Sequence, residues 1–429
     1  MTRVVQKFGG SSVADADSIK RVAKRVLATK QAGHDVCVVI SAMGDTTDEL
    51  MDLALQVSPI PKPRELDMLL TTGERQSAAL LAMALADLGA EARSYTGSQA
   101  GVITTGKHGD ARIIDITPGR VTSALDEGSI VIVAGFQGVS QDTKDITTLG
   151  RGASDTTAVA LAAALGADHC EIYTDVDGIF TADPRICPAA RQVPEISYEE
   201  MMEMAASGAK VLHLRCVEYA RRENVRVHVR SSFSDRSGTW VKDLNDINPL
   251  TDKDGNPMEQ AIISGVAHDR GEAKITIVGV PDQVGVAARI FDEIASAGIN
   301  IDMIVQNQSR VSTSRTDISF TLPKTEGRNA MQRLNDIKER IGFEELLFDD
   351  QIGKVSIVGV GMKSHPGVTA KFFRALADAD VNLDMISTSE IRISVVVNAE
   401  AVDRAVRAAH TAFGLDADGE AVVYAGTGR

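Results

Sequence analysis

Short apolar runs alternate with longer amphipathic segments over residues 1–240. The runs 36–40, 130–134, 171–173 and 225–230 are rich in β-branched residues and predict strands. The segments between them have apolar residues at helical spacing. Strands that alternate with helices in this way indicate a layered α/β domain.

Two of the predicted helices have recognisable starts. Asp15 or Asp17 could cap the first of them, whose apolar face is formed by Ile19, Val22, Ala23, Val26 and Leu27. Ser197 and Glu200 have the spacing of a capping box, which predicts that another helix begins there.

A second pattern follows a polar segment. Residues 235–257 are rich in Asp, Asn, Gly, Ser and Pro, which is typical of a linker. Beyond it, the segment 274–280 (KITIVGV) recurs as 354–360 (KVSIVGV). Each copy has the pattern strand, glycine-containing loop, amphipathic helix and strand, which is the first half of a ferredoxin-like βαββαβ module. We therefore expect an α/β domain, a linker and two modules, at residues 1–240, 241–262, 263–345 and 346–429.

Composition narrows the class of protein. The chain has 429 residues, of which 44% are hydrophobic and 24% charged, as expected for a globular protein of about two to four domains. No apolar stretch approaches the roughly 20 residues of a membrane span, and no leader precedes the first strand, so we expect a cytoplasmic protein. The net charge of −14 argues against nucleic acid or an anionic membrane as a partner. The four widely spaced cysteines indicate core packing rather than a zinc or disulfide framework.

The most informative motif is 7–12 (KFGGSS), directly after an apolar strand. Its glycines allow backbone N–H groups to approach an anion, and Lys7 supplies a mobile positive charge, so the motif predicts a phosphate site. It is not a P-loop, because Lys7 precedes Gly9 and Gly10 instead of following them. The alternative is an ordinary turn.

Two further clusters are open to two interpretations. The hydroxyl-rich segment 41–48 follows the strand 36–40 and could bind a phosphate or a carboxylate, or could simply cap a helix. Gly73, Glu74 and Arg75 lie inside an otherwise helical run, where they could form part of a site or a solvated helix face.

The segment 150–155 (GRGASD) precedes an apolar helix that we expect at 156–165. A helix N-terminus with an arginine suits a carboxylate, since the guanidinium can bind both oxygens, and this motif predicts an amino-acid site. Alternatively, Ser154 or Asp155 is a plain N-cap and Arg151 a surface charge.

Residues 173–185 carry acidic and hydroxyl side chains after a strand, and these could hold the base and ribose of a nucleotide. Arg185 could reach its phosphates, and Lys210 could supply a second cation. The spacing does not fit a twelve-residue calcium loop.

In this order, the motifs 7–12, 73–75, 150–155 and 174–178 resemble those of the aspartate kinases, which are members of the amino acid kinase family. The resemblance covers essentially the whole chain and is closest to the actinobacterial form that lysine and threonine regulate. It implies an αβα sandwich with a mainly parallel central sheet, followed by two ACT domains. It also implies transfer of the γ-phosphoryl group of ATP, with Mg²⁺, to the β-carboxylate of L-aspartate, giving 4-phospho-L-aspartate and ADP. This reaction is the first step in the biosynthesis of lysine, diaminopimelate, threonine, methionine and isoleucine.

The resemblance implies roles for individual residues. Lys7 stabilises the transferring phosphoryl group, Asp155 organises Lys7, and Glu74 binds the α-ammonium group of aspartate. Arg151 binds the α-carboxylate, and the other aspartate-binding residues are Thr47, Gly152, Ala153 and Ser154. ATP is bound by Lys7, Phe8, Gly9, Gly10, Ser11, Ser41, Ser154, Thr174, Asp175, Phe180, Arg185 and Lys210. No metal ligand comes directly from the protein, so Mg²⁺ is bound through ATP.

The two C-terminal modules are implied to bind lysine and threonine between neighbouring chains, so we expect a homo-oligomer. The implied effector residues are Asp282, Gly285, Val286, Ala287, Asn300, Ile301, Gln306, Val368, Thr369, Asn382, Leu383, Ser389 and Glu390. Alternatively, the repeat forms only an oligomer interface. Related enzymes also make a short regulatory subunit from an internal start, which here would lie near Met258.

Two positions depart from the family pattern, since Phe180 or Ile179 stands where tyrosine is usual and Ala153 where glycine is common. Two rival functions remain open. The chain could be another amino acid kinase, or a catalytically silent amino-acid sensor with a degenerate kinase domain.

Overall fold

The computed structural model describes residues 2–150, 152–247, 262–307, 314–362, 365 and 367–424. The chain divides into two compact units. The first comprises Met1–Ala205, Lys210–Met258 and Asp418–Arg429, and the second comprises Ala206–Ala209 and Glu259–Ala417. The described segment 418–424 thus belongs to the first unit and not to the second C-terminal module, where the sequence places it. The described helices include none with the length and apolar character needed to cross a bilayer.

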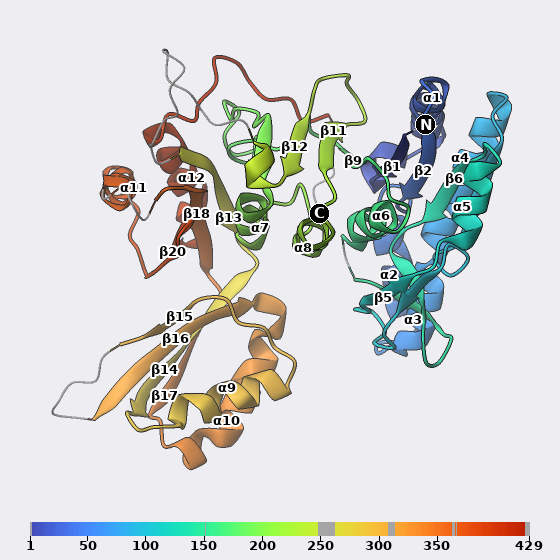
Figure 1. Ribbon diagram of the computed structural model, residues 1–429. Coiled ribbons are helices and arrows are strands. Elements are labelled where there is room, and N and C mark those ends of the chain that lie inside the picture. The colour runs from blue at the N-terminus through green and yellow to red at the C-terminus, as the bar shows by residue number, and fades with distance from the viewer. Residues whose placement is uncertain are drawn as a thin grey trace. The chain divides into compact units, whose positions relative to one another are not determined.

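The first unit is built on an eight-stranded, mainly parallel sheet with the order β10-β12-β11-β9-β1-β2-β6-β3 (Figure 1). This confirms the α/β class with a mainly parallel sheet. Its strands are β1 (Arg3–Phe8), β2 (Asp35–Ile40), β3 (Ala92–Tyr95), β6 (Ile130–Ala134), β9 (His169–Thr174), β10 (Glu195–Ser197), β11 (Val227–Ser231) and β12 (Thr239–Lys242). β12 extends past residue 240, where we placed the end of the domain.

Helices cover both faces of this sheet. The helices of the first unit are α1 (Ala16–Gln31), α2 (Thr46–Val57), α3 (Pro63–Leu70), α4 (Thr72–Asp87), α5 (Gly119–Asp126), α6 (Ala153–Ala164), α7 (Tyr198–Ala206) and α8 (Leu214–Glu223). On one face, Val36, Val38 and Ile40 pack in a common core with apolar residues of α1 and α4. On the opposite face, α6 packs against β1, β2 and β9. Burial on both faces explains why these strands are continuous apolar runs.

Both predicted helix starts are confirmed. α1 begins at Ala16, and the side chain of Asp15 accepts a hydrogen bond from the backbone N–H of Ser18 at 2.8 Å. In the capping box, the backbone N–H of Glu200 donates to Ser197 Oγ, and the backbone N–H of Ser197 donates to Glu200 Oε2, both at 3.2 Å. Local sequence therefore determines these helix starts.

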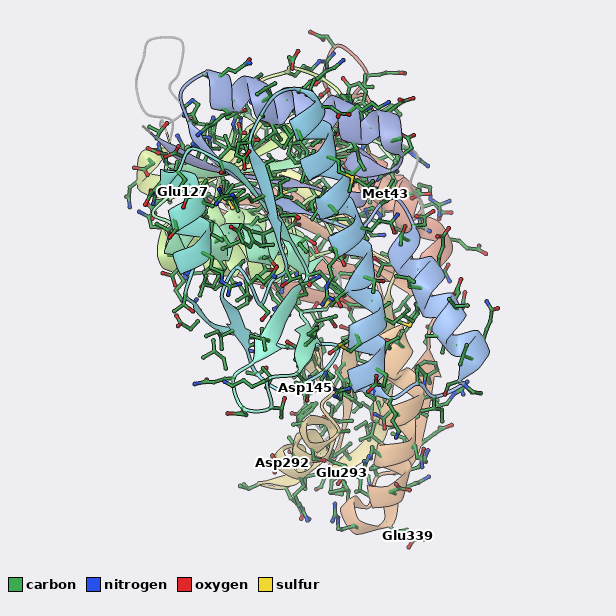
Figure 2. The ribbon with its side chains drawn as sticks, turned by 90° about the vertical axis from the view of Figure 1, so that its right-hand side faces the viewer. Met43, Glu127, Asp145, Asp292, Glu293 and Glu339 are labelled. Atoms are coloured by element: carbon green, nitrogen blue, oxygen red, sulfur yellow. The ribbon has the colours of Figure 1, made fainter. Side chains whose placement is uncertain are left out.

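A smaller four-stranded sheet with the order β5-β4-β7-β8 also belongs to the first unit. Its strands are β4 (Val102–Thr104), β5 (Ile113–Ile116), β7 (Gln137–Ser140) and β8 (Ile146–Thr148). Asp145, labelled in Figure 2, lies in the turn before β8 and accepts a hydrogen bond at 2.9 Å from Arg64 of α3.

The second unit contains two four-stranded sheets. The first has the order β15-β16-β14-β17 and the element sequence βαββαβ, as the repeat predicts. Its elements are β14 (Glu272–Pro281), α9 (Val286–Ser296), β15 (Ile304–Gln306), β16 (Arg315–Pro323), α10 (Gly327–Ile341) and β17 (Glu345–Asp349).

The second module completes its sheet with a strand from before the first module. Its own elements are β18 (Ile352–Val360), α11 (Gly367–Asp378), β19 (Met385–Thr388), β20 (Arg392–Asn398) and α12 (Val402–Ala412). β13 (Ile262–Asp269) pairs antiparallel with β18 and gives the order β13-β18-β20-β19. The structure therefore corrects our boundary at residue 263, since β13 belongs to the second sheet and not to the first. The reason is that β18 needs a partner along its outer edge, and among the described residues no strand follows α12 in its own repeat.

Candidate active site

The polar loops of the first unit meet at the carboxyl ends of the parallel strands β1, β2 and β6. A Cβ atom on Gly10 would lie 2.9 Å from the backbone oxygen of Gly44 and 3.1 Å from that of Ala42. Only glycine fits this close approach, which brings the loops after β1 and β2 together. The approach is fixed by a hydrogen bond from the N–H of Gly44 to the oxygen of Gly10 at 3.1 Å. Open α/β sheets bind their ligands at this edge.

Lys7 and Asp155 form a buried ion pair at this edge. Lys7 Nζ lies 2.6 Å from Asp155 Oδ1, and the two side chains are only 13% and 9% exposed. A Cβ atom on Gly9 would lie 3.3 Å from Lys7 Nζ, so the glycine leaves room for the ammonium group beside the turn. The carboxylate fixes the direction of a charge that would otherwise be mobile.

Glu74 lies in the first turn of α4 and is 3% exposed. Burial raises the pKa of its carboxyl group to about 7, although hydrogen bonds from the backbone of Glu74 and Ala42 and the charge of Arg75 oppose the increase. Gly73 permits this position, because a Cβ atom there would lie 2.8 Å from the Cβ of Ala42. Within the described part of the chain, Glu74 Oε2 has no hydrogen-bond partner. A ligand with an ammonium group could supply the missing donor.

The motif 150–155 forms the start of α6, which begins at Ala153 and not at the expected residue 156. Gly152 has a φ of +72° and packs against His213, since a Cβ atom would lie 2.6 Å from His213 Cδ2. Ser154 comes close to the loop after β6, because a Cβ atom on Gly135 would lie 2.9 Å from Ser154 Oγ. Arg151, the residue predicted to bind a carboxylate, lies outside the described residues.

Thr47 lies in the first turn of α2, next to Thr46. Thr46 is close to the start of α4, because a Cβ atom on Gly73 would lie 3.5 Å from Thr46 Cγ2. The turns that carry Thr47 and Glu74 are therefore neighbours. Ser41 is the first residue after β2, and its backbone N–H donates to the oxygen of Phe8 at 3.1 Å. Ser11 lies in a short 3₁₀ helix, Gly10–Val13, directly after β1.

The predicted nucleotide loop follows β9. Arg185 Nη2 lies 3.1 Å from Asp175 Oδ2, and Thr174 Oγ1 donates to Asp175 Oδ1 at 3.0 Å. Phe180 is 7% exposed and pairs with Gln192 in an isolated β-bridge. Lys210 follows α7 and is exposed.

The structure limits how Phe8 could contact a nucleotide. Phe8 is fully buried, and its ring stacks on Tyr173 with ring centroids 4.6 Å apart. Its side chain belongs to the core beneath α1 and α4. Phe8 can therefore contribute only its backbone to a site at this edge.

The predicted effector residues lie at the ends of elements in the second unit. Asp282 and Gly285 precede α9, Val286 and Ala287 begin it, and Gln306 ends β15. In the second module, Val368 and Thr369 lie in the first turn of α11, Asn382 and Leu383 precede β19, and Ser389 and Glu390 follow it. Asn300 and Ile301 line a cavity of about 200 Å³ together with Glu272 and Asp302.

Two residues that the sequence did not single out, Arg215 and His213, support the motif 150–155 from behind. Arg215 of α8 donates to the backbone oxygens of Leu149 at 2.7 Å and Ala111 at 3.0 Å, and so holds the chain just before Gly150. His213 supports Gly152, and burial lowers the pKa of its imidazole. The charge of Arg215 was the one signal available in the sequence, and its position far along the chain gave no reason to connect it with residue 150.

Comparison with known proteins places this geometry in a family. The model of the amino acid kinase family matches residues 2–231, and that of the ACT domain matches residues 275–337 and 355–413. An aspartokinase of Mycolicibacterium smegmatis is 65% identical over 430 residues, and the match covers 100% of both chains. The chain belongs to the aspartokinases.

Two solved structures of E. coli aspartokinase III have the same fold at 26% identity. The complex with aspartate and ADP, described as the R-state, matches with a TM-score of 0.80 over 95% of this chain and 99% of that chain. The complex with lysine and aspartate, described as the T-state, matches with a TM-score of 0.69 over 95% of this chain and 98% of that chain.

Proposed function

We propose that this chain transfers the γ-phosphoryl group of ATP to the β-carboxylate of L-aspartate. The observation that carries the proposal is the pairing of Lys7 with Asp155 at the same sheet edge as Glu74, whose buried Oε2 atom has no described partner. The ammonium group of Lys7 suits a phosphate, and the carboxylate of Glu74 suits an ammonium group. The aspartokinase relatives and the E. coli complex with aspartate and ADP support the same substrates.

Aspartate would bind between α2, α4 and α6. Glu74 accepts its α-ammonium group, and Arg151 binds its α-carboxylate through both guanidinium nitrogens. Thr47, Gly152, Ala153 and Ser154 complete this part of the site. The β-carboxylate then points towards Lys7.

The phosphates would lie on the turn after β1. The backbone N–H groups of Gly9, Gly10 and Ser11 and the ammonium group of Lys7 neutralise the charge that develops on the transferring group. A carboxylate is already a nucleophile, so the reaction needs no general base. The residues that hold the two reacting anions in line therefore perform the catalysis.

The adenosine part of ATP would lie along the loop after β9. We assign this contact to Thr174, Asp175, Phe180, Arg185 and Lys210, with Ser41 and Ser154 nearer the phosphates. The glycine turn beside Lys7 suits ATP as a polyanion. In the described ranges, no three His, Cys, Asp or Glu residues are grouped so that they could hold a metal ion. We assign Mg²⁺ to the ATP complex, where it would reduce the repulsion between the triphosphate and aspartate.

The C-terminal modules would regulate this activity. We propose that lysine and threonine bind at the effector residues between modules of neighbouring chains, and that the protein is a cytoplasmic homo-oligomer. The E. coli complex that contains lysine supports an amino acid as the effector. An internal start near Met258, which lies outside the described residues, would give a regulatory subunit. We also propose that the catalytic domain extends to the end of β12 at Lys242 and that the linker lies between β12 and β13.

A hydroxamate assay tests the proposal. The purified protein with ATP and Mg²⁺ should form acyl phosphate with L-aspartate and not with L-glutamate or N-acetylglutamate. Activity with glutamate or N-acetylglutamate would indicate another amino acid kinase. Absence of turnover with all three, together with binding of lysine or threonine, would indicate a silent sensor.

A further inference from the structure

The described end of the chain adds a short strand to the predicted nucleotide loop. Val423 forms an antiparallel β-bridge with Val176. The backbone N–H of Tyr424 donates to the oxygen of Asp175 at 2.9 Å, and that of Ala421 donates to the oxygen of Pro188 at 2.7 Å. These bonds connect residues that are more than two hundred positions apart in the sequence, so the loop after β9 owes part of its conformation to the C-terminal segment 421–424.

Tyr424 also contacts this loop through its side chain. Its hydroxyl group donates to Asp177 Oδ2 at 3.2 Å, and its ring stacks on Phe233, with centroids 5.8 Å apart and planes 11° apart. Asp177 is 1% exposed, and the same carboxylate accepts hydrogen bonds from Ser234 Oγ at 2.5 Å and Arg236 Nη1 at 3.2 Å. A buried carboxylate depends on such donors, because each lost donor leaves a charge that is only partly satisfied.

Tyr424 and the nucleotide residues act on the same short stretch of chain. The side chain of Asp175 accepts hydrogen bonds from Thr174 Oγ1 and from Arg185. Its backbone oxygen accepts a hydrogen bond from the N–H of Tyr424. Asp177, two residues later, accepts a hydrogen bond from the Tyr424 hydroxyl group. The segment therefore fixes the backbone from which the proposed nucleotide contacts project.

We propose that Tyr424 is a positioning residue for nucleotide binding, an inference that rests on the assignment of residues 174–185 to the nucleotide. It holds Asp175 and Asp177 in the binding conformation without touching ATP. When the loop is not held, part of the binding energy of ATP must be used to order it, which weakens binding. Aspartate binding does not involve this loop and stays unchanged.

Three variants test the inference: Tyr424→Phe, Tyr424→Ala and the control Val422→Ala. Val422 lies in the same segment, and its side chain is 38% exposed. For each full-length variant we would measure kcat and the KM values for ATP and aspartate, and determine the affinity for ADP by isothermal titration calorimetry. We expect Tyr424→Phe, which loses the hydrogen bond to Asp177 and keeps the ring, to raise the KM for ATP and the Kd for ADP about tenfold, the effect of about one lost hydrogen bond to a charged group. Tyr424→Ala also loses the stacking on Phe233 and should give a larger increase. Aspartate KM and the control should not change.

The outcomes separate this inference from the proposed function. Arg185→Ala is measured in parallel, because Arg185 is assigned to the nucleotide directly. If Arg185→Ala weakens ADP binding and both Tyr424 variants do not, the positioning role is wrong while the nucleotide site stands. If Arg185→Ala leaves ADP binding unchanged, the nucleotide site itself is misplaced. A general structural role for Tyr424 would lower kcat and raise both KM values together, which would also contradict the inference.

Discussion

Replacement of Glu74 by glutamine is expected to stabilise the protein while it weakens aspartate binding. Glu74 is 3% exposed, and burial raises the pKa of its carboxyl group from 4.5 to about 7. The neutral, protonated carboxyl group is the form that the buried site favours. Its contribution to the free energy of unfolding is complete below pH 4.5 and is lost as the pH rises through about 7. At pH 8 the loss is about 3 kcal/mol. Glutamine has a similar shape and does not ionise, so it avoids the loss.

Thermal unfolding at two pH values measures this effect. At pH 8 the first unit of Glu74→Gln should unfold at a temperature about 6–12 °C above that of the wild type, as expected for about 3 kcal/mol in a domain of this size. At pH 5 the difference in stability should be about 1 kcal/mol or less. Glu49→Gln is the matched control, because Glu49 is exposed on α2 and should show no difference at either pH. Equal or lower unfolding temperatures for Glu74→Gln at pH 8 would refute the reasoning.

The same group should make aspartate binding depend on pH. The α-ammonium group of aspartate pairs with Glu74 only when the carboxyl group is ionised. With a pKa of about 7, the ionised fraction falls about tenfold between pH 8 and pH 6, so the wild-type affinity should fall by the same factor. Glu74→Gln should bind aspartate about 10 to 100 times more weakly at pH 8 and show no such dependence, since a hydrogen bond to a charged group is lost. Calorimetric titration of aspartate at both pH values provides the measurement.

Three further predictions concern the phosphates and the effectors. Lys7→Ala should lower kcat by about 10² to 10³ with little change in the affinity for aspartate, and near-normal turnover in a steady-state assay would refute its role. Gly10→Ala should reduce the free energy of unfolding by about 1–3 kcal/mol and weaken ATP binding, because its Cβ atom would lie 2.9 Å from a backbone oxygen. Melting curves and ATP titrations measure the two effects, and unchanged values would contradict the close approach. Asp282→Ala and Gln306→Ala should relieve inhibition by lysine plus threonine with little change in the uninhibited rate, since an effector acts only through unequal affinity for two states; inhibitor titrations of both variants would show it, and unaltered inhibition would exclude these positions.

Local pattern predicted the elements near the site well. The runs 36–40 and 130–134 are strands β2 and β6, and Asp15 and the pair Ser197 and Glu200 cap their helices. The start of α6 was placed too late. That helix is buried along Ala153 to Ala162 and has no polar face, so periodicity could not mark its first turn, while Gly152 at φ +72° sets its actual start.

Pairings between distant segments could not be predicted. The β13 strand joins β18 across the whole first module, and the segment 421–424 returns to the loop after β9. Neither contact has a signal in the local sequence, because a short strand carries no information about its partner. The position of Phe8 in the core follows from the packing of β1 against α1 and α4, which the glycine-rich motif after it does not indicate.

A crystal structure of the protein with aspartate and a non-hydrolysable ATP analogue tests the central claim most directly. We expect the terminal phosphate beside Lys7 Nζ and the amides of Gly9 and Gly10, and the α-ammonium group of aspartate on Glu74 Oε2, with the β-carboxylate facing the phosphate. A triphosphate bound away from Lys7, or an aspartate that leaves Glu74 Oε2 without a donor, would contradict the account.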